Sequence, residues 1–317
     1  MKWNNHLSSQ RDLLGGGPQG SSLGLLEYDS QSNNNADFLS DDDKYKFVDD
    51  LSVLDIINLL SVGLSSYNFK HKVVSDVGID QHYLPSENIK SQSHMDKISD
   101  WTIKNKMKLN ESKSKVMVFN YTTKYQFATR VHLNNNLLET ISETSLLVTV
   151  VSSYLKWHSN SKLLTQKGYQ QMTILRKLYD FDIPLEDLVM IYNMYVRSIL
   201  EYNSCVWFSS ITNEERENLE RVQRVACKII LKEQYTNYNQ ALKILDLQNL
   251  SDRRQMLAGR FANKCVKSER FSDLFPLADE TNTRSNDKYS VQFANTTRLK
   301  DSSIPAMRRI LNKEGKK

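Results

Sequence analysis

Cysteine is scarce in this chain, and the scarcity excludes several kinds of site. Only Cys205, Cys227 and Cys265 occur among 317 residues. They are odd in number and too widely spaced for a Cys-x-x-Cys metal site. The six histidines show no metal-ligand spacing either. We therefore expect buried, inert thiols in a reducing compartment, and an intracellular protein that is nuclear or cytoplasmic.

Long apolar runs are also missing. No stretch approaches the roughly 18 apolar residues that a membrane-spanning helix requires, so we expect no membrane partner. The N-terminal segment Met1–His6 is polar and lacks the apolar core of a signal peptide. A hydrophobic fraction of 39% and a mean hydropathy of −0.54 are typical of a soluble chain. The length allows one to three domains, each with a sizeable core.

The net charge of +5 is unevenly distributed along the sequence. Residues 1–50 carry four Lys and Arg against nine Asp and Glu, whereas residues 160–317 carry 26 against 19. The acidic head fits a cation-binding region and the basic tail fits a polyanion. The alternative for the tail is a solvated surface of mixed charge, because both signs are interspersed there.

Two adjacent carboxylates, Asp49 and Asp50, interrupt the β-prone run Tyr45–Leu54. Paired acids repel each other and lose hydration, and a divalent cation offsets both effects. The alternative is a surface turn with no ligand. The pattern predicts a hairpin with both acids at its turn.

The rest of the chain separates into a mixed part and a helical part. Residues 1–46 are expected to be largely irregular. A helix is predicted from Ile89 to Met107, with Met95, Ile98, Trp101 and Ile103 inward. Strands are predicted over Val116–Phe119, Phe127–Leu133 and Leu146–Val151. After Trp157, helices are predicted over Leu163–Tyr179, Leu185–Trp207, the segment opened by the capping box Thr212–Glu215, Tyr238–Leu245, Leu250–Lys267 and Ile304–Asn312.

Three short motifs occur in an order that resembles a reverse transcriptase. Gly-Pro-Gln-Gly (Gly17–Gly20), Phe-Val-Asp-Asp (Phe47–Asp50) and Leu-Asn-x-x-Lys (Leu109–Lys113) are similar to palm motifs B, C and D. Later segments resemble the polymerases of LINE-type (non-LTR) retrotransposons; they are Leu155–His158, Arg197–Tyr202, Leu219–Gln223 and Ile304–Pro305. The resemblance covers roughly residues 13–313. Each motif alone is weak, but their order with a matching tail is specific.

The resemblance implies an α+β fold, in which a partial palm with a few antiparallel strands is followed by an all-helical thumb and C-terminal region. Residues 1–44 are expected to be a mostly irregular remnant carrying Gly-Pro-Gln-Gly. Residues 45–157 are expected to form the truncated palm, and residues 158–317 the helical thumb and C-terminal region.

The resemblance also implies a role for each motif. Asp49 would ligate catalytic Mg²⁺, and Asp50 would add negative potential beside it. Pro18, Gln19 and Gly20 would contact the template base and incoming nucleotide. Lys113 would stabilise the triphosphate or protonate pyrophosphate, although a solvated surface lysine is the ordinary alternative.

Nucleic-acid contacts are implied for two further segments. The primer-grip hairpin would include Ser145–Val151, Leu155 and Trp157. The basic side of the helix after Thr212 would contact the RNA or DNA backbone; its cations are Arg216, Arg221, Arg224 and Lys228. The alternative is that this side is the solvated face of an amphipathic helix. Trp101, Trp157 and Trp207 are expected to be core anchors rather than base-stacking platforms.

Two departures from the family pattern bear on activity. The family places another metal-binding aspartate in a strand before Gly-Pro-Gln-Gly, but only Met1–Leu14 precede it here, with Asp12 as the sole acid. The metal site formed by Asp49 and Asp50 is then incomplete, so Mg²⁺ is not expected to be retained. The usual Gly-Val of the primer-grip strand is Val148-Thr149, which removes a glycine expected at a tight bend.

We therefore expect a reverse transcriptase-like (RNA-directed DNA polymerase) fragment of a retrotransposon that lacks polymerase activity by itself. The first alternative is a non-catalytic nucleic-acid-binding module that uses the basic helical half. The second is a helical part that serves protein–protein contact.

Overall fold

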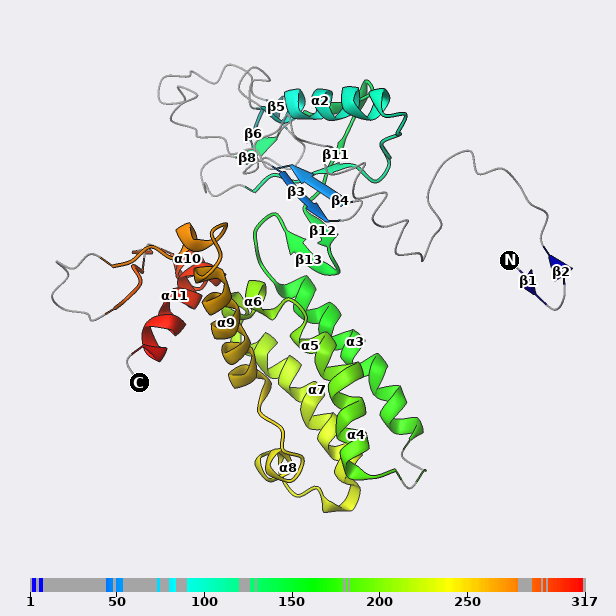
Figure 1. Ribbon diagram of the computed structural model, residues 1–317, viewed down its shortest axis with the longest axis vertical. Coiled ribbons are helices and arrows are strands. Elements are labelled where there is room, and N and C mark those ends of the chain that lie inside the picture. Colours follow the sequence, from blue (N-terminus) through cyan, green and yellow to red (C-terminus); the bar gives the residue numbers. More distant parts are fainter. Residues whose placement is uncertain are drawn as a thin grey trace. The chain divides into compact units, whose positions relative to one another are not determined.

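The chain divides into two compact units, Met1–Ser142 and Glu143–Lys317, which are described separately (Figure 1). The computed structural model describes residues 91–119, 130–178, 181, 183–278, 287–291, 293–294 and 296–315 with their side chains, and the backbone alone of short elements elsewhere. The described chain is mostly helical with a few small strands, in agreement with an α+β class. None of its described helices combines the length and the apolar character that crossing a membrane requires.

The strands of the first unit are short and form small, separate pairings, some of them between strands far apart in sequence. The hairpin predicted around the paired acids is confirmed for the backbone, because β3 (Lys44–Phe47) and β4 (Asp50–Val53) are antiparallel with Phe47 opposite Asp50. Two other pairings, β6–β8 and β7–β11, are parallel. The remaining bounds are β1 Lys2–Trp3, β2 His6–Leu7, β5 Val73–Val74, β6 Asp80–Tyr83, β7 Lys115–Val116, β8 Gln126–Ala128, β9 His132–Leu133, β10 Asn136–Leu137 and β11 Glu139–Thr140.

The helix α2 (Lys90–Lys104) packs against β9 in the first unit. Ile98 is buried as predicted, but Ile103 is 68% exposed, so its predicted inward position is wrong. The helix ends one residue after Ile103, where the last turn has lost its packing partner. A small core of Val131, Leu133 and Leu138 lies beside Met95 and Leu109.

A tight hairpin opens the second unit. β12 (Glu143–Leu146) pairs with β13 (Thr149–Ser152), and the chain reverses at Leu147 and Val148. Both turn residues have positive φ, 46° and 67°. The predicted single strand over Leu146–Val151 is therefore wrong, because the apolar run contains a turn that no glycine or asparagine marks.

Three helical segments build the main core of the second unit. α3 (His158–Lys177) packs against α7 (Asn213–Leu231) and against the segment formed by α4 (Leu185–Ile191), the π-helix η2 (Tyr192–Arg197) and α5 (Ser198–Glu201), as Figure 1 shows. Their shared core includes Trp157, Met172, Tyr192, Leu219 and Val222. The side chains come from one face of each helix, as their spacing predicted.

The predicted single helix over Leu185–Trp207 is interrupted. The chain leaves helical geometry at Tyr202, whose ψ is 127°, and Asn203 has a left-handed φ of 50°. Asparagine adopts this conformation more readily than other non-glycine residues. The chain resumes as α6 (Ser204–Trp207), and Trp207 is fully buried as predicted.

The final helices form a second, smaller core. α9 (Leu250–Val266) packs against α11 (Ser303–Glu314), with Ala262, Phe275, Tyr289 and Leu311 between them. The α11 residue Asn312 exchanges two hydrogen bonds with the backbone of Tyr289, each of 2.9 Å. The other elements are η3 Phe208–Ser210, η4 Lys232–Gln234, α8 Tyr238–Ile244, η5 Ser272–Leu274 and α10 Thr297–Lys300.

Candidate nucleic-acid interface

The palm-like motif residues lie mostly outside the described residues. Pro18, Gln19, Gly20 and Asp49 are outside them, and Asp50 is described only as the first backbone position of β4. Among the described residues, no group of three His, Cys, Asp or Glu side chains is arranged to hold a metal ion. The carboxylate metal site therefore stays a prediction.

Lys113 lies in an exposed turn of the first unit. Its backbone amide donates to the Asn110 side-chain oxygen (3.2 Å), an Asx-type arrangement that fixes the turn. The adjacent Glu111 accepts hydrogen bonds from Asn134 and Asn136 at 2.8 and 2.7 Å. These bonds hold the pKa of Glu111 below its usual value. The Lys113 side chain is thus presented to solvent on an ordered loop.

The capping box predicted for α7 is confirmed. The Glu215 amide donates to Thr212 Oγ1 (3.2 Å), and the Thr212 amide donates to the Glu215 carboxylate (2.7 Å). The other Glu215 oxygen contacts His158 Nδ1 at 3.2 Å. The start of α7 is thereby tied to the start of α3.

The four predicted contact residues on α7 do not share one face. Residues of an α-helix are about 100° apart around the axis, which places Arg221, Arg224 and Lys228 within about 60° and Arg216 about 80° beyond them. Arg216 instead stacks on the Phe208 ring (4.5 Å) and donates to the Ser209 carbonyl (3.2 Å). Burial lowers the pKa of Arg216.

The other α7 cations meet aromatic rings supplied from beyond the helix. Arg224 lies 5.2 Å from the Tyr238 ring and 2.9 Å from the Glu217 carboxylate. Lys228 lies 5.4 Å from the Tyr235 ring, and Arg221 is exposed. This side of α7 therefore carries partly neutralised charge, which lowers its attraction for a polyanion relative to free cations.

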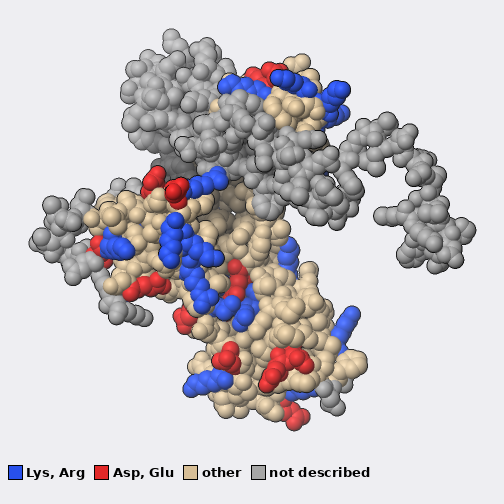
Figure 2. All heavy atoms as spheres, viewed as in Figure 1, with Lys and Arg blue, Asp and Glu red and all other residues tan. Residues whose placement is uncertain are grey.

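A more continuous basic surface lies on α9, and the sequence-based interpretation missed it. We call it the α9 stripe; it consists of Arg253, Arg260, Lys264 and Lys267. Their spacing of i, i+7, i+11 and i+14 places them within about 60° around the helix axis. No Asp or Glu lies within that arc of this fully described helix. Figure 2 shows Lys and Arg side chains gathered over α9.

One member of the α9 stripe is paired and the others are exposed. Arg253 Nε lies 2.5 Å from the Glu201 carboxylate. Arg260, Lys264 and Lys267 are exposed. The heptad spacing of like charge was the available signal, and it is hidden when the helix is examined for apolar residues alone.

The segment Leu219–Gln223, one of the family-like motifs, has a structural role in the core. The Tyr192 hydroxyl donates to Gln223 Oε1 (2.6 Å), and Gln223 Nε2 donates to the Tyr238 hydroxyl (2.8 Å). The Tyr238 hydroxyl also donates to the Glu220 carboxylate, which accepts a second hydrogen bond from the Leu250 amide at 3.0 Å. This network joins η2, α7, α8 and the start of α9.

The family-like segment Arg197–Tyr202 meets α9 at a buried cation. The guanidinium of Arg254 is fully buried, lies 5.3 Å from the Trp207 ring and donates to the Leu200 carbonyl at 3.1 Å. Desolvation lowers the pKa of Arg254 to about 10. Together with the pair of Arg253 and Glu201, this contact fixes the α9 stripe on the core.

The segment Leu155–His158 joins the hairpin to α3. Trp157 is buried at the N-cap of α3. The Asn160 side-chain oxygen accepts a hydrogen bond from the Val150 amide (3.1 Å). The Ser152 hydroxyl donates to the Lys156 carbonyl (2.8 Å) and accepts from the Lys156 amide (3.0 Å). The β12–β13 hairpin is thus held at the end of the helical core.

Comparisons with protein-family models, with curated proteins and with solved structures gave no match to this chain. The candidate interface therefore rests on the chain's own geometry. Its parts are the β12–β13 hairpin, the α7 cations and the α9 stripe, all within the second unit.

Proposed function

We propose that this chain is a reverse transcriptase-like polypeptide of a LINE-type retrotransposon. We further propose that its helical unit binds RNA or DNA through backbone phosphates. The order of three palm-like motifs and four downstream segments supports the proposal. The chain alone supplies only Asp49 and Asp50 from the matched metal-binding motifs, so its proposed role by itself is binding rather than polymerisation.

The turn of the β12–β13 hairpin is the observation that carries the family proposal. The family pattern has a glycine at the position of Val148, at a tight bend. The backbone here has a left-handed φ of 67°, the conformation that glycine adopts without steric cost. The bend agrees with the pattern although the residue does not.

The α9 stripe is the observation that supports phosphate binding. Its members span 14 residues, or about 21 Å of helix at about 1.5 Å per residue. A nucleic-acid duplex carries one phosphate per about 3.4 Å on each strand, so several phosphates of one strand fall within the length of the α9 stripe. Exposed cations such as Arg260, Lys264 and Lys267 gain affinity by releasing counterions from such a strand.

Binding to a labelled RNA–DNA duplex, followed by fluorescence anisotropy over a series of KCl concentrations, tests this function. We expect the full chain to bind, with an affinity that falls steeply as salt rises. The triple variant Arg260→Gln/Lys264→Gln/Lys267→Gln should bind more weakly, and its log–log salt slope should be smaller by about 2 to 3.

A charge-matched variant on α3 is the control for that experiment. Lys162, Arg176 and Lys177 are exposed, and replacing all three by Gln changes the net charge equally. This variant should keep most of the affinity and the salt slope. An equal loss of affinity in both triple variants would show that the α9 stripe has no particular role. Absence of binding at low salt would contradict the proposed function.

A further inference from the structure

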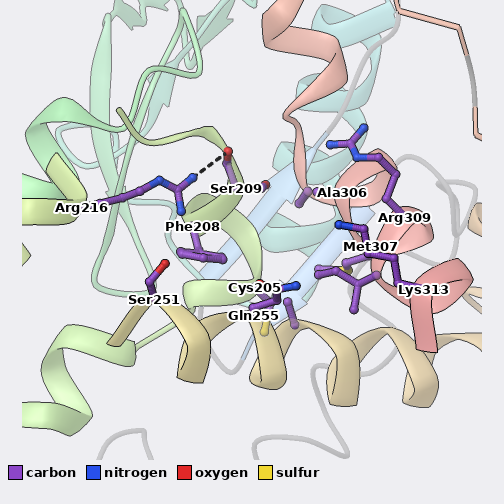
Figure 3. Close-up of a pocket in the computed structure, with 13 residues that line it drawn as sticks. Cys205, Phe208, Ser209, Arg216, Ser251, Gln255, Ala306, Met307, Arg309 and Lys313 are labelled. Atoms are coloured by element: carbon purple, nitrogen blue, oxygen red, sulfur yellow. Dashed lines mark hydrogen bonds between the residues drawn. The ribbon is translucent and has the colours of Figure 1, made fainter. Parts of the chain in front are cut away.

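A pocket lies on the side of α9 opposite the α9 stripe, between α6, η3, α7 and α11, with a volume of about 240 Å³. Figure 3 shows Arg216 at one side and Arg309 and Lys313 at the other, with Phe208 and Gln255 between them. Its apolar base includes Met307, which is 2% exposed. Cationic side chains from two helices thus border one small cavity.

The charge of this pocket is in positive excess. None of its lining residues, all of them described, is an Asp or Glu. Outside the lining, Asp301 lies 3.6 Å from the Arg309 guanidinium. Asp301 and Glu215, both outside the lining, also act on Arg216. The three lining cations outnumber these two carboxylates, so the pocket favours an anionic group.

Several hydrogen-bond donors in the pocket are free to meet such a group. A guanidinium has five N–H donors, and among the described residues Arg216 uses one of them on Ser209. Ser209 also lines the pocket, and its Oγ is buried with no hydrogen-bond partner among the described residues. A buried hydroxyl without a partner is costly, and an incoming oxygen acceptor would relieve that cost.

We propose that this pocket binds a phosphate monoester or pyrophosphate group. Such a group carries about −1.5 to −2 charge with three acceptor oxygens, so it can meet three cations and several of their donors, whereas a carboxylate offers one charge and two oxygens. The cavity is smaller than the roughly 300 Å³ at which drug-sized sites begin, so it fits the phosphate end of a ligand. The site is separate from the α9 stripe and does not depend on the function proposed for it.

Equilibrium dialysis of the full chain against radiolabelled pyrophosphate tests the site. We expect saturable binding, weakened about tenfold or more by Arg309→Gln and by Lys313→Gln because each removes a charge-assisted contact. Lys162→Gln removes one charge from the exposed side of α3 and should leave binding within about twofold. No saturable binding in the millimolar range, or equal affinity in all three variants, would overturn the proposal.

Cys205 offers a second readout that needs no variant. Its free thiol lines the pocket and packs against the small core that contains the buried Cys265. Pyrophosphate should slow alkylation of Cys205 by iodoacetamide; unchanged Cys205 labelling at saturating pyrophosphate would contradict the location. Competition by 5′-phosphorylated and 5′-hydroxyl oligonucleotides distinguishes the source, because a site for nucleic-acid ends prefers the phosphorylated one.

Discussion

Val148 holds a backbone conformation that suits glycine better than a β-branched residue. Its φ of 67° lies in the left-handed region, and its side chain is 56% exposed, so little packing offsets the strain. A left-handed conformation costs an L-residue about 1–2 kcal/mol. Replacement by glycine removes this cost, but part of the gain is lost because glycine has more conformational entropy in the unfolded chain. We predict that Val148→Gly raises the free energy of unfolding by about 1 kcal/mol, measured by urea denaturation.

The same substitution two residues later provides the matched control. Val150 lies within β13, where a side chain packs and glycine weakens the strand. Val150→Gly should lower the free energy of unfolding. Equal losses in both variants would show that the turn at Val148 does not require a left-handed residue.

Burial of Cys227 makes stability depend on alkaline pH. Desolvation raises the pKa of the Cys227 thiol from 9.0 to about 12. Between these values the unfolded thiol ionises while the folded one keeps its proton, so the unfolded state binds fewer protons. This contribution is complete below pH 9 and is lost as pH rises towards 12.

The wild-type free energy of unfolding should therefore fall between pH 9 and 12. In Cys227→Ala the fall should be shallower, and the comparison uses the slope because the variant also leaves a small cavity. The free energy of unfolding of Cys227→Ala should still fall with pH, because burial also raises the pKa of Tyr192 and of Tyr238. Identical slopes in both proteins would mean that Cys227 titrates normally.

At the scale of the elements, two glycines mark close helix packing of different kinds. A Cβ on Gly168 of α3 would lie 3.0 Å from core atoms of both Leu200 and Val222. A Cβ on Gly259 of α9 would meet the far end of the Glu314 side chain at 2.7 Å, and that side chain can move away. The first site is confined on both sides, whereas the second has a flexible neighbour.

We predict that Gly168→Ala lowers the free energy of unfolding by about 1–2 kcal/mol. The cost of overpacking exceeds the stabilisation that alanine gains from its higher helix propensity. Gly259→Ala should cost clearly less, since the same helix preference acts there against a yielding side chain. Thermal denaturation of the two variants gives the comparison. A larger loss at Gly259 would mean that α9 and α11 pack more rigidly than α3 and α7.

Element positions could be predicted where local chemistry fixes them. The capping residues Thr212 and Glu215 predict the start of α7, and the apolar spacing after Leu250 and Ile304 predicts α9 and α11. The break at Asn203 could not be predicted from apolar spacing, because its neighbours remain apolar across it. The hairpin turn at Leu147–Val148 was hidden for the same reason, although the family pattern pointed to a bend.

The role of each cation could not be predicted from one helix alone. The spacing on α7 shows which side chains point outward, but the Phe208 and Tyr238 rings that engage Arg216 and Arg224 come from other segments. The α9 stripe was visible in the sequence as charge at heptad spacing. Distinguishing it from α7 required knowing which cations lack a facing acid or ring.

At the scale of the whole molecule, the proposed family role predicts the activity of the chain by itself. Two-metal catalysis of nucleotide addition needs more carboxylate oxygens than Asp49 and Asp50 would provide. We predict that the 317-residue chain gives no template-dependent primer extension with Mg²⁺ or Mn²⁺. Extension that is abolished by Asp49→Ala would contradict this prediction, and extension unaffected by that change would indicate a contaminating polymerase.

The π-helix η2 also constrains how this chain can vary in length. Its i to i+5 hydrogen bonds accommodate an extra residue relative to an α-helical turn. Removing one residue between Tyr192 and Arg197 would restore α-helical geometry and leave the rotational position of the following segment nearly unchanged. Leu200 and Glu201 would then still meet Arg254 and Arg253. Related chains should therefore tolerate a single-residue deletion within this segment better than one in the neighbouring α-helical turns, which would rotate the segment that follows by about 100°.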